Sequence, residues 1–150
     1  MNNRIYQLTK APVPNNEWFN EDDIRETSFI GSVADCVYNQ PSEERESNIG
    51  WFMRYREEVF ARDGNKITVL PGAKHAYFKR RYEQFKKYAV QMTLDDFCDS
   101  YETWVLQEII QNKYHIYIYR NGKWQSLDHF IRVVEEGSVF YIGGIVGYRC

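Results

Sequence analysis

The sequence contains no long hydrophobic run. Its longest apolar stretch, Val139 to Tyr148, is interrupted by three glycines, whereas a membrane-spanning helix needs about 18 or more consecutive apolar residues. Residues Met1 to Arg4 are polar, and no apolar segment follows them that could form the centre of a secretory signal. We therefore expect a cytoplasmic protein without a membrane segment.

Cysteine is also scarce, with three residues that are odd in number and far apart: Cys36, Cys98 and Cys150. Without a CxxC motif or a Cys/His cluster, this pattern indicates neither a disulfide scaffold nor a zinc site. Glycines 143, 144 and 147 resemble a phosphate loop, but too few residues follow them to form the helix that such a loop requires. We expect reduced thiols, no cofactor and no metal.

Recognisable catalytic motifs are absent, including the nucleophile elbow, the zinc-protease motif and the Walker motif. A catalytic cysteine needs a nearby base and an electropositive setting. Cys98 falls on the apolar face of a predicted helix, Cys36 follows Asp35, and Cys150 is the last residue. We therefore expect none of these cysteines to act as a nucleophile with one of the three histidines, His75, His115 and His129, as its base. The chain is expected to be non-enzymatic, with a hydrolase or transferase with an unrecognised site as the second alternative.

Aromatic residues are abundant, since 12 Tyr, 9 Phe and 4 Trp make up 17% of 150 residues. A chain of this length is enough for one domain, which we assign to residues 1–150. Surface Tyr and Trp are enriched at protein interfaces. The composition is therefore compatible with two structures: a domain with an aromatic binding surface, and a domain with a tyrosine-rich core.

The net charge of -2 conceals a strongly segregated chain. Residues 15–63 contain 5 basic and 12 acidic residues, residues 64–92 contain 7 basic and 1 acidic, and residues 93–113 have a net charge of -4. Nucleic-acid-binding domains are usually basic overall. Here only one segment is basic.

The periodicity predicts an α+β fold. We expect a strand over residues 5–9, a helix capped by Asn20, a second short helix over 32–38, a helix over 43–62 and a strand over 67–70. Two clearer helices are predicted over 73–91 and 94–112, the second capped by Thr93 with Asp96 in a capping box. Helical spacing in these segments assigns four aromatic side chains to the core: Phe78, Phe85, Phe97 and Tyr101.

After residue 113 the apolar period changes from that of a helix to that of a strand. Residues 114–119 alternate, and Asn121-Gly122 is typical of a type I′ hairpin turn. Trp124 begins the return strand, Ser126 caps a helix over 127–134, and the last strand covers 139–148. We predict a small antiparallel sheet, made of this hairpin, the last strand and optionally the N-terminal strand, packed against the three main helices.

The basic helix over residues 74–88 provides the candidate binding residues. At about 100° per residue, Lys79, Arg80, Lys86 and Lys87 share one face, and Tyr77, Arg81 and Tyr88 lie beside it. Three interpretations are open: a surface for another protein, a nucleic-acid site that combines cations with stacking tyrosines, and a solvated helix face. On the following helix, Asp95, Asp99 and Glu102 share one side, which acids near a helix start explain without a metal.

We favour a non-enzymatic interaction protein that binds another protein through an aromatic and charged surface. A small chain of this kind would suit an inhibitor or accessory factor of a phage or mobile element. Binding of nucleic acid by the basic helix is the first alternative. The sequence leaves homo-oligomerisation open.

Overall fold

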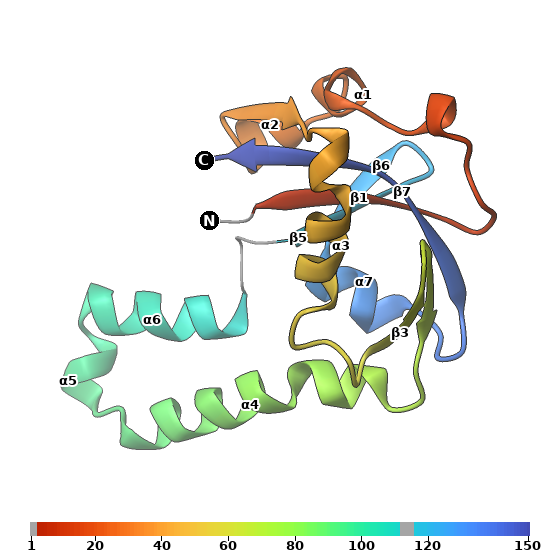
Figure 1. Cartoon of the computed structure of the whole chain (residues 1–150). Coiled ribbons are helices and arrows are strands. Elements are labelled where there is room, and N and C mark those ends of the chain that lie inside the picture. The colour runs from red at the N-terminus through yellow and green to blue at the C-terminus, as the bar shows by residue number, and fades with distance from the viewer. Residues whose placement is uncertain (1–2, 112–115) are drawn as a thin grey trace.

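The computed structural model describes residues 3–111 and 116–150, which contain one seven-stranded sheet (Figure 1). Its strands are β1 (Arg4–Thr9), β2 (Cys36–Asn39), β3 (Phe60–Asp63), β4 (Lys66–Val69), β5 (Ile116–Arg120), β6 (Lys123–Ser126) and β7 (Val139–Arg149). Six of them follow the order β3-β4-β7-β1-β5-β6, and β2 pairs with β7. β1 and β5 run parallel, whereas the other described pairs are antiparallel.

The α+β class is confirmed, but the sheet is larger than predicted and is mixed. We expected the C-terminal hairpin to pair with the last strand, whereas β1 lies between β5 and β7. The residues of β1 explain this central place. Ile5 is buried on one face of the sheet, and Tyr6 and Leu8 are buried on the other. A strand that is apolar on both faces is suited to the middle of a covered sheet.

The helices are α1 (Glu21–Arg25), α2 (Phe29–Ser32), α3 (Arg45–Met53), α4 (Ala73–Gln91), α5 (Leu94–Phe97), α6 (Ser100–Ile110) and α7 (Leu127–Val133). Two short 3-10 turns, η1 (Asn15–Glu17) and η2 (Ser42–Glu44), precede α1 and α3. The predicted caps are confirmed. Asn20 and Thr93 each form a capping box, and the Ser126 hydroxyl accepts the amide hydrogen of His129.

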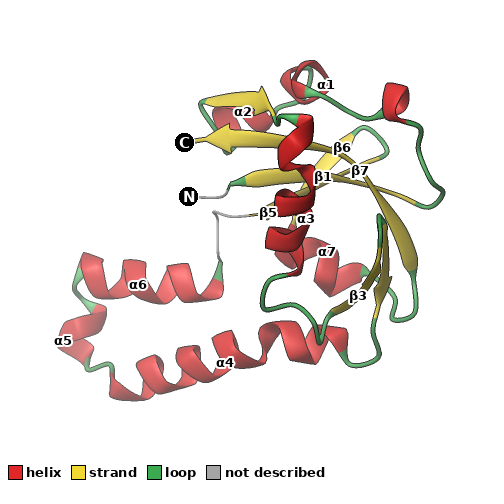
Figure 2. Ribbon diagram, viewed as in Figure 1, coloured by secondary structure: helices red, strands yellow, loops and turns green. Residues whose placement is uncertain are grey.

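Helices cover both faces of the sheet (Figure 2). One face carries α3 and α7, with Phe52 and Phe130 buried against the sheet. The other carries α1 and α2, where Phe29 makes edge contacts with the rings of Tyr117 and Tyr148. Most of the buried apolar residues therefore lie in and around the sheet.

The turns of the C-terminal half agree with the sequence. Asn121 and Gly122 have φ values of 52° and 74°, as a type I′ turn requires. A glycine of β7 allows another segment to approach closely. A Cβ atom at Gly144 would lie 2.2 Å from the carbonyl oxygen of Phe19.

In the N-terminal half one predicted helix is wrong and another is longer than the observed one. Residues 36–39 form β2, in which Val37 pairs with Tyr148 of β7. Val and Tyr fit a pleated surface well, and the long-range pairing outweighs the local helical pattern. Helix α3 ends at Met53, well before residue 62, because Tyr55 adopts a φ of 62° that a right-handed helix does not allow. Phe60, which has helical spacing with α3, instead begins β3.

The helix predicted over 94–112 is broken in two. The side chain of Asp99 accepts the amide hydrogen of Tyr101 and so starts α6 as a separate helix. Helices α5 and α6 do not cover the sheet as predicted. They fold back along the outer part of α4, and the three helices extend away from the sheet (Figure 1).

Candidate functional site

The three helices α4, α5 and α6 form a projection, residues 73–110, which we call the arm. Of the four aromatic residues of the arm that were predicted for the core, Phe78 packs against the core beside the sheet, but none is fully buried. Phe97 and Tyr101 are 61% and 65% exposed, and Phe78 and Phe85 are half-buried. Nine large hydrophobic side chains are strongly exposed among the described residues, and seven of them belong to the arm: Tyr82, Val90, Leu94, Phe97, Tyr101, Trp104 and Ile110. Such a concentration is typical of a binding surface.

The base of the arm is fixed to the sheet by a buried carboxylate. Asp128 of α7 accepts a hydrogen bond of 2.7 Å from the Tyr77 hydroxyl and forms an ion pair of 2.8 Å with Arg81. Burial, and next the charge of Asp128, raise the pKa of Tyr77 well above its usual range. Two of the predicted binding residues, Tyr77 and Arg81, thus attach α4 to α7.

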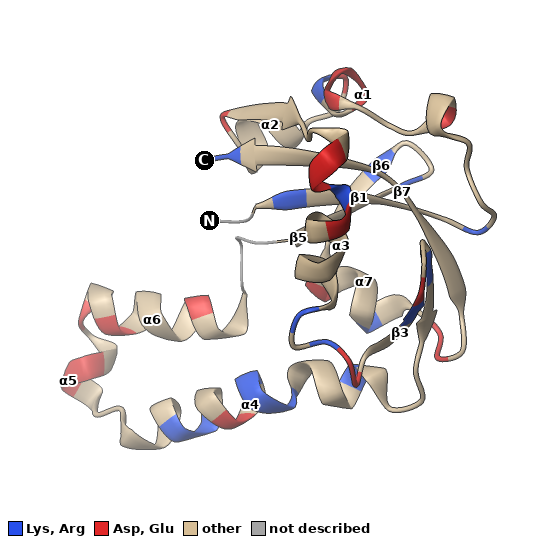
Figure 3. Cartoon of the chain, viewed as in Figure 1, with Lys and Arg blue, Asp and Glu red and all other residues tan. Residues whose placement is uncertain are grey.

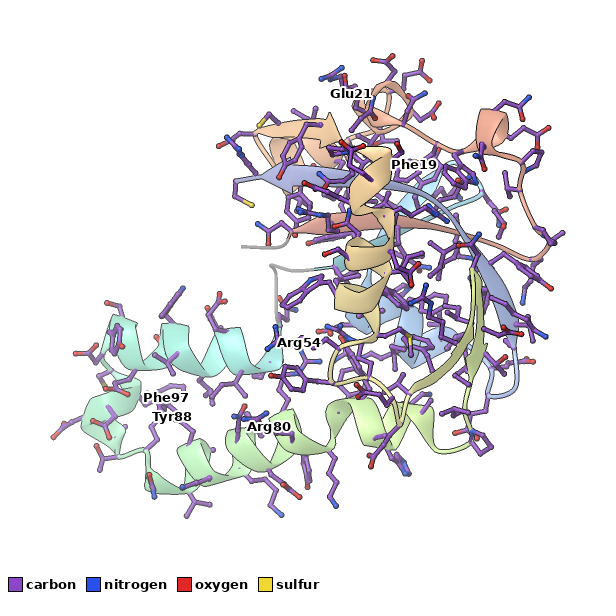
Figure 4. The ribbon with its side chains drawn as sticks, in the orientation of Figure 1. Phe19, Glu21, Arg54, Arg80, Tyr88 and Phe97 are labelled. Carbon is purple, nitrogen blue, oxygen red and sulfur yellow. The ribbon has the colours of Figure 1, made fainter. Side chains whose placement is uncertain are left out.

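The outer part of the arm is held by a second tyrosine–carboxylate contact. The Tyr88 hydroxyl of α4 donates to the carboxylate of Glu102 on α6. This hydrogen bond raises the pKa of Tyr88 to about 12. Figure 4 shows Tyr88 on the side of α4 that faces α5 and α6. Tyr88, also a predicted binding residue, therefore joins α4 to α6.

The remaining predicted residues, Lys79, Arg80, Lys86 and Lys87, are exposed on α4. One of them lines a hollow of about 490 Å³ that runs along this helix. We call this hollow the basic groove, and its lining residues are Lys74, His75, Phe78, Lys79 and Tyr82. The structure thus brings Lys79 together with two aromatic rings.

Cations surround the aromatic side chains of the basic groove. The ammonium nitrogen of Lys86 lies 5.2 Å from the ring centre of Tyr82. The guanidinium groups of Arg81 and Arg132 lie 5.0 and 4.6 Å from that of Phe78. Each distance is within the range of cation–π attraction. The groove therefore has an aromatic floor and a positively charged rim.

A smaller hollow of about 310 Å³ lies at the base of the arm and shares Lys74 and His75 with the basic groove. Its other walls are mainly apolar and come from β4, α4, α7 and the turn before β7: Val69, Ala73, Ile131, Val134 and Glu136. The carboxylate of Glu136 accepts the amide hydrogen of Gly72. The concave surface of α4 thus continues toward the sheet.

Sequence reasoning missed the groove because it assigned the stripe of Phe78, Tyr82, Phe85 and Ala89 to the core. In the structure Tyr82 and Ala89 are exposed. The helix is instead attached through the adjacent face, which carries Tyr77 and Arg81. The signal for exposure is present in the sequence, since a narrow stripe next to Lys79 and Lys86 suits a surface as well as a core.

The other half of the arm has the opposite charge (Figure 3). Residues 73–91 contain six basic residues and one acidic residue, whereas residues 92–110 contain five acidic residues and no basic one. The four ion pairs found within residues 3–111 and 116–150 include none between these two limbs. The opposite charges of the arm lie close together but form no direct ion pair there.

Cys36, Cys98 and Cys150 are exposed, which corrects the placement of Cys98 on a core face. The Cys150 thiol donates to the carbonyl of Val33, and burial raises its pKa, so it is not an activated thiolate. His115 lies outside the described residues.

The described residues also contain no group of three or more His, Cys, Asp or Glu side chains that could hold a metal ion. Asp99 caps α6 and Glu102 accepts from Tyr88, which accounts for two of the three acids on that side of the helix. Within the same residues, none of the helices has the length and apolar character needed to cross a membrane.

A further hollow, of about 160 Å³, lies beside the start of α3 and is lined by residues that include Trp18, Gln40 and Asn48. Its cation, Arg45, stacks 3.9 Å from the ring centre of Trp18 and donates to the carbonyls of Ile142 and Gly143. Burial lowers the pKa of Arg45. These bonds explain Arg45 as a structural link between α3 and β7.

The basic groove contains one of the seven predicted binding residues, Lys79. The chain matches no protein-family model, no curated protein and no solved structure.

Proposed function

We propose that this chain is a non-enzymatic interaction protein that binds an acidic, partly apolar surface of another protein through the basic groove. The observation that carries the proposal is the exposed aromatic stripe of α4 with its cationic rim. Tyr82 is 59% exposed and sits in the groove between Lys79 and Lys86 along the helix. Exposed tyrosine beside cations gives large contact area and charge attraction in one place.

The base of the arm supports this use of the groove. A binding surface must hold its shape before the partner arrives, because ordering it on contact reduces affinity. The bonds from Tyr77 and Arg81 to Asp128 fix the inner half of α4 from the face opposite to solvent. Lys74, Phe78 and Lys79 are therefore presented on a helix that is already anchored.

The acidic limb of the arm favours a protein partner over nucleic acid. Asp95, Asp99 and Glu108 lie on α5 and α6 or at their junction, and α6 packs along α4. A phosphate backbone that followed the cations of α4 would meet these carboxylates and be repelled at distances below about 10 Å. A protein surface can place its own acidic and apolar groups so that this repulsion is avoided.

Charge reversal in the groove tests the proposal. We expect Lys74→Glu with Lys79→Glu to abolish capture of the partner from a lysate of the cells that carry the gene. The matched control is Lys66→Glu with Lys123→Glu, which makes the same change of charge at exposed positions of β4 and β6. Loss of capture in both double variants would mean that net charge alone matters, and the groove would not be the site.

The nucleic-acid alternative has its own measurement. Wild-type protein is expected to give no gel shift with DNA or RNA at roughly physiological salt. If it binds with a micromolar or tighter Kd that weakens steeply with salt, and the groove variant loses this binding, the basic helix is a nucleic-acid site.

Truncation of Tyr82 tests the aromatic part of the surface. Tyr82→Ala is expected to weaken partner binding by about tenfold or more, equal to about 1.4 kcal/mol, because aromatic anchors dominate interface energies. Tyr55→Ala is the control, since Tyr55 is 81% exposed and outside the arm. The affinity of each variant for the captured partner is measured by titration calorimetry. Equal effects of the two substitutions would contradict a special role for Tyr82.

A further inference from the structure

We propose that the outer part of the arm is a self-association surface that pairs with the same surface of a second copy of this chain. This surface, which we call the arm tip, is separate from the basic groove. It consists of exposed apolar side chains at the end of α4, on α5 and at the start of α6: Val90, Leu94, Phe97, Tyr101 and Trp104.

The arm tip is too apolar to be an ordinary surface. Val90 and Leu94 are 84% and 78% exposed, although each is an aliphatic side chain with no group that can hydrogen-bond to water. The rings of Tyr101 and Trp104 lie 6.1 Å apart at an angle of 31°, so they form one exposed aromatic pair. Helices α5 and α6 contain no buried residue, and α4 contains only Ala73. Helices of this kind gain most of their stability from packing against another surface.

The charges of the arm indicate which surface that is. The first limb of the arm has a net charge of +5, from six basic residues and one acidic residue, and the second limb has a charge of -5. A partner with one sign of charge would match one limb and repel the other. A second arm, placed so that the basic limb of each copy meets the acidic limb of the other, matches both.

This arrangement has the symmetry that a homodimer requires. In a two-fold interface the same patch occurs on both sides, so it must be complementary to itself. The arm has no net charge, and its cations and carboxylates form no ion pair with one another within the chain where the structure describes it. The arm also extends from the sheet (Figure 1), with α4 alone about 28 Å long. Two arms can lie side by side without contact between the two sheets.

The mass of the protein in solution is the first test. Sedimentation equilibrium of the whole chain is expected to give twice the monomer mass of 18.0 kDa and a dissociation constant that rises with salt. A protein that remains at 18.0 kDa up to about 1 mM, the concentration at which a millimolar Kd becomes visible, would overturn the proposal.

Charge exchange between two variants is the sharper test. Lys86→Glu with Lys87→Glu lowers the net charge of the basic limb from +5 to +1, and Asp95→Lys with Glu108→Lys reduces that of the acidic limb from -5 to -1. None of these four side chains makes a hydrogen bond or ion pair that the structure records within the described chain, so both variants are expected to fold. Each variant alone is expected to dimerise much more weakly than the wild type, because one limb of every facing pair has lost most of its charge.

A mixture of the two variants should restore the dimer, since the unchanged acidic limb of one variant then meets the unchanged basic limb of the other. A mixture that stays monomeric while circular dichroism shows both variants folded would overturn the pairing of limbs. The Asp95→Lys with Glu108→Lys variant leaves the lining and the cationic rim of the basic groove unchanged, whereas Lys86→Glu alters the rim beside Tyr82. Capture of the partner protein by the Asp95→Lys with Glu108→Lys variant therefore tests the groove independently of dimerisation.

Discussion

Asp128 lies 7% exposed at the start of α7 and is shared by two side chains of α4. Tyr77 donates to one of its oxygens and Arg81 to the other. A buried carboxylate that loses one partner retains the cost of its desolvation. This one residue therefore controls how firmly the arm is attached to the sheet.

Removal of the Tyr77 hydroxyl tests that role. Tyr77→Phe is expected to lower the free energy of unfolding by about 1.5–3 kcal/mol, the usual range for a hydrogen bond to a charged group. Urea denaturation at neutral pH measures the difference. Tyr38→Phe is the control, because Tyr38 is half-buried on β2 and the side-chain partners of Asp128 are Tyr77 and Arg81. An equal loss in both variants would contradict the anchoring role of Tyr77.

The pKa of Tyr77 gives this contribution a pH dependence. Burial and Asp128 raise its pKa above that of an unfolded tyrosine, about 10. A group whose pKa is raised in the folded state contributes stability that is fully present below the unfolded pKa and is lost as pH rises further. The difference between wild type and Tyr77→Phe should thus be constant below about pH 10 and shrink above it.

Gly122 provides a second prediction for a single residue. Its φ of 74° lies in the left-handed region, where a β-branched residue is strained. Gly122→Val is expected to cost about 1–3 kcal/mol, measured as the change in free energy of unfolding. Gly50→Ala is the matched control, because Gly50 lies inside α3 and a Cβ atom there would contact nothing within 4 Å. This control is expected to stabilise the chain by about 0.4–1 kcal/mol.

At the scale of elements, aromatic truncation distinguishes the arm from the sheet. Phe130 of α7 is fully buried, and Phe130→Ala is expected to cost about 3–5 kcal/mol. Phe97 and Tyr101 are exposed, and their alanine variants should each cost less than about 1 kcal/mol in the monomer. Thermal unfolding of dilute protein measures both. If Phe97→Ala costs as much stability as Phe130→Ala, α5 packs into the core, as the sequence predicts.

The elements that the sequence predicts correctly are those fixed by local chemistry. The caps at Asn20, Thr93 and Ser126 and the turn at Asn121-Gly122 depend on residues within four positions of each other. Helix α4 is predicted with its observed bounds, Ala73–Gln91, because a long periodic segment has few alternatives.

The elements that the sequence does not predict depend on distant partners. β2 is a strand because β7 pairs with it, and β1 is central because β5 lies parallel to it. Of the candidate site, the cations of α4 were predictable and the exposure of Tyr82 was not. An amphipathic stripe shows that a helix has an apolar side, but it does not show whether the chain itself covers that side.

For the whole molecule, the distribution of buried residues implies two levels of stability. β7 is largely buried and pairs with β1, β2 and β4. Helices α5 and α6 have no buried residue and are joined to α4 by contacts that include the bond from Tyr88 to Glu102. Regions with few buried contacts open locally without global unfolding. The arm and the sheet should therefore lose their structure separately.

Hydrogen exchange followed by mass spectrometry can resolve these two levels. Amides of β1 and β7 are expected to exchange only through global unfolding, so their opening free energy should fall with added denaturant in proportion to the whole surface exposed. Amides of α5 and α6 should exchange earlier and with little dependence on denaturant, because the opening that releases them exposes little surface.

If two arms pair, the protection of amides in α5 and α6 must also rise with protein concentration. The protection of amides at the centre of β7 must rise only by the amount by which dimerisation stabilises the whole fold. The Lys86→Glu with Lys87→Glu variant is the control, since it should show the two levels without the concentration dependence. Uniform protection of arm and sheet in dilute wild type would mean that the arm unfolds together with the sheet, and its exposed aromatic side chains would then need a different explanation.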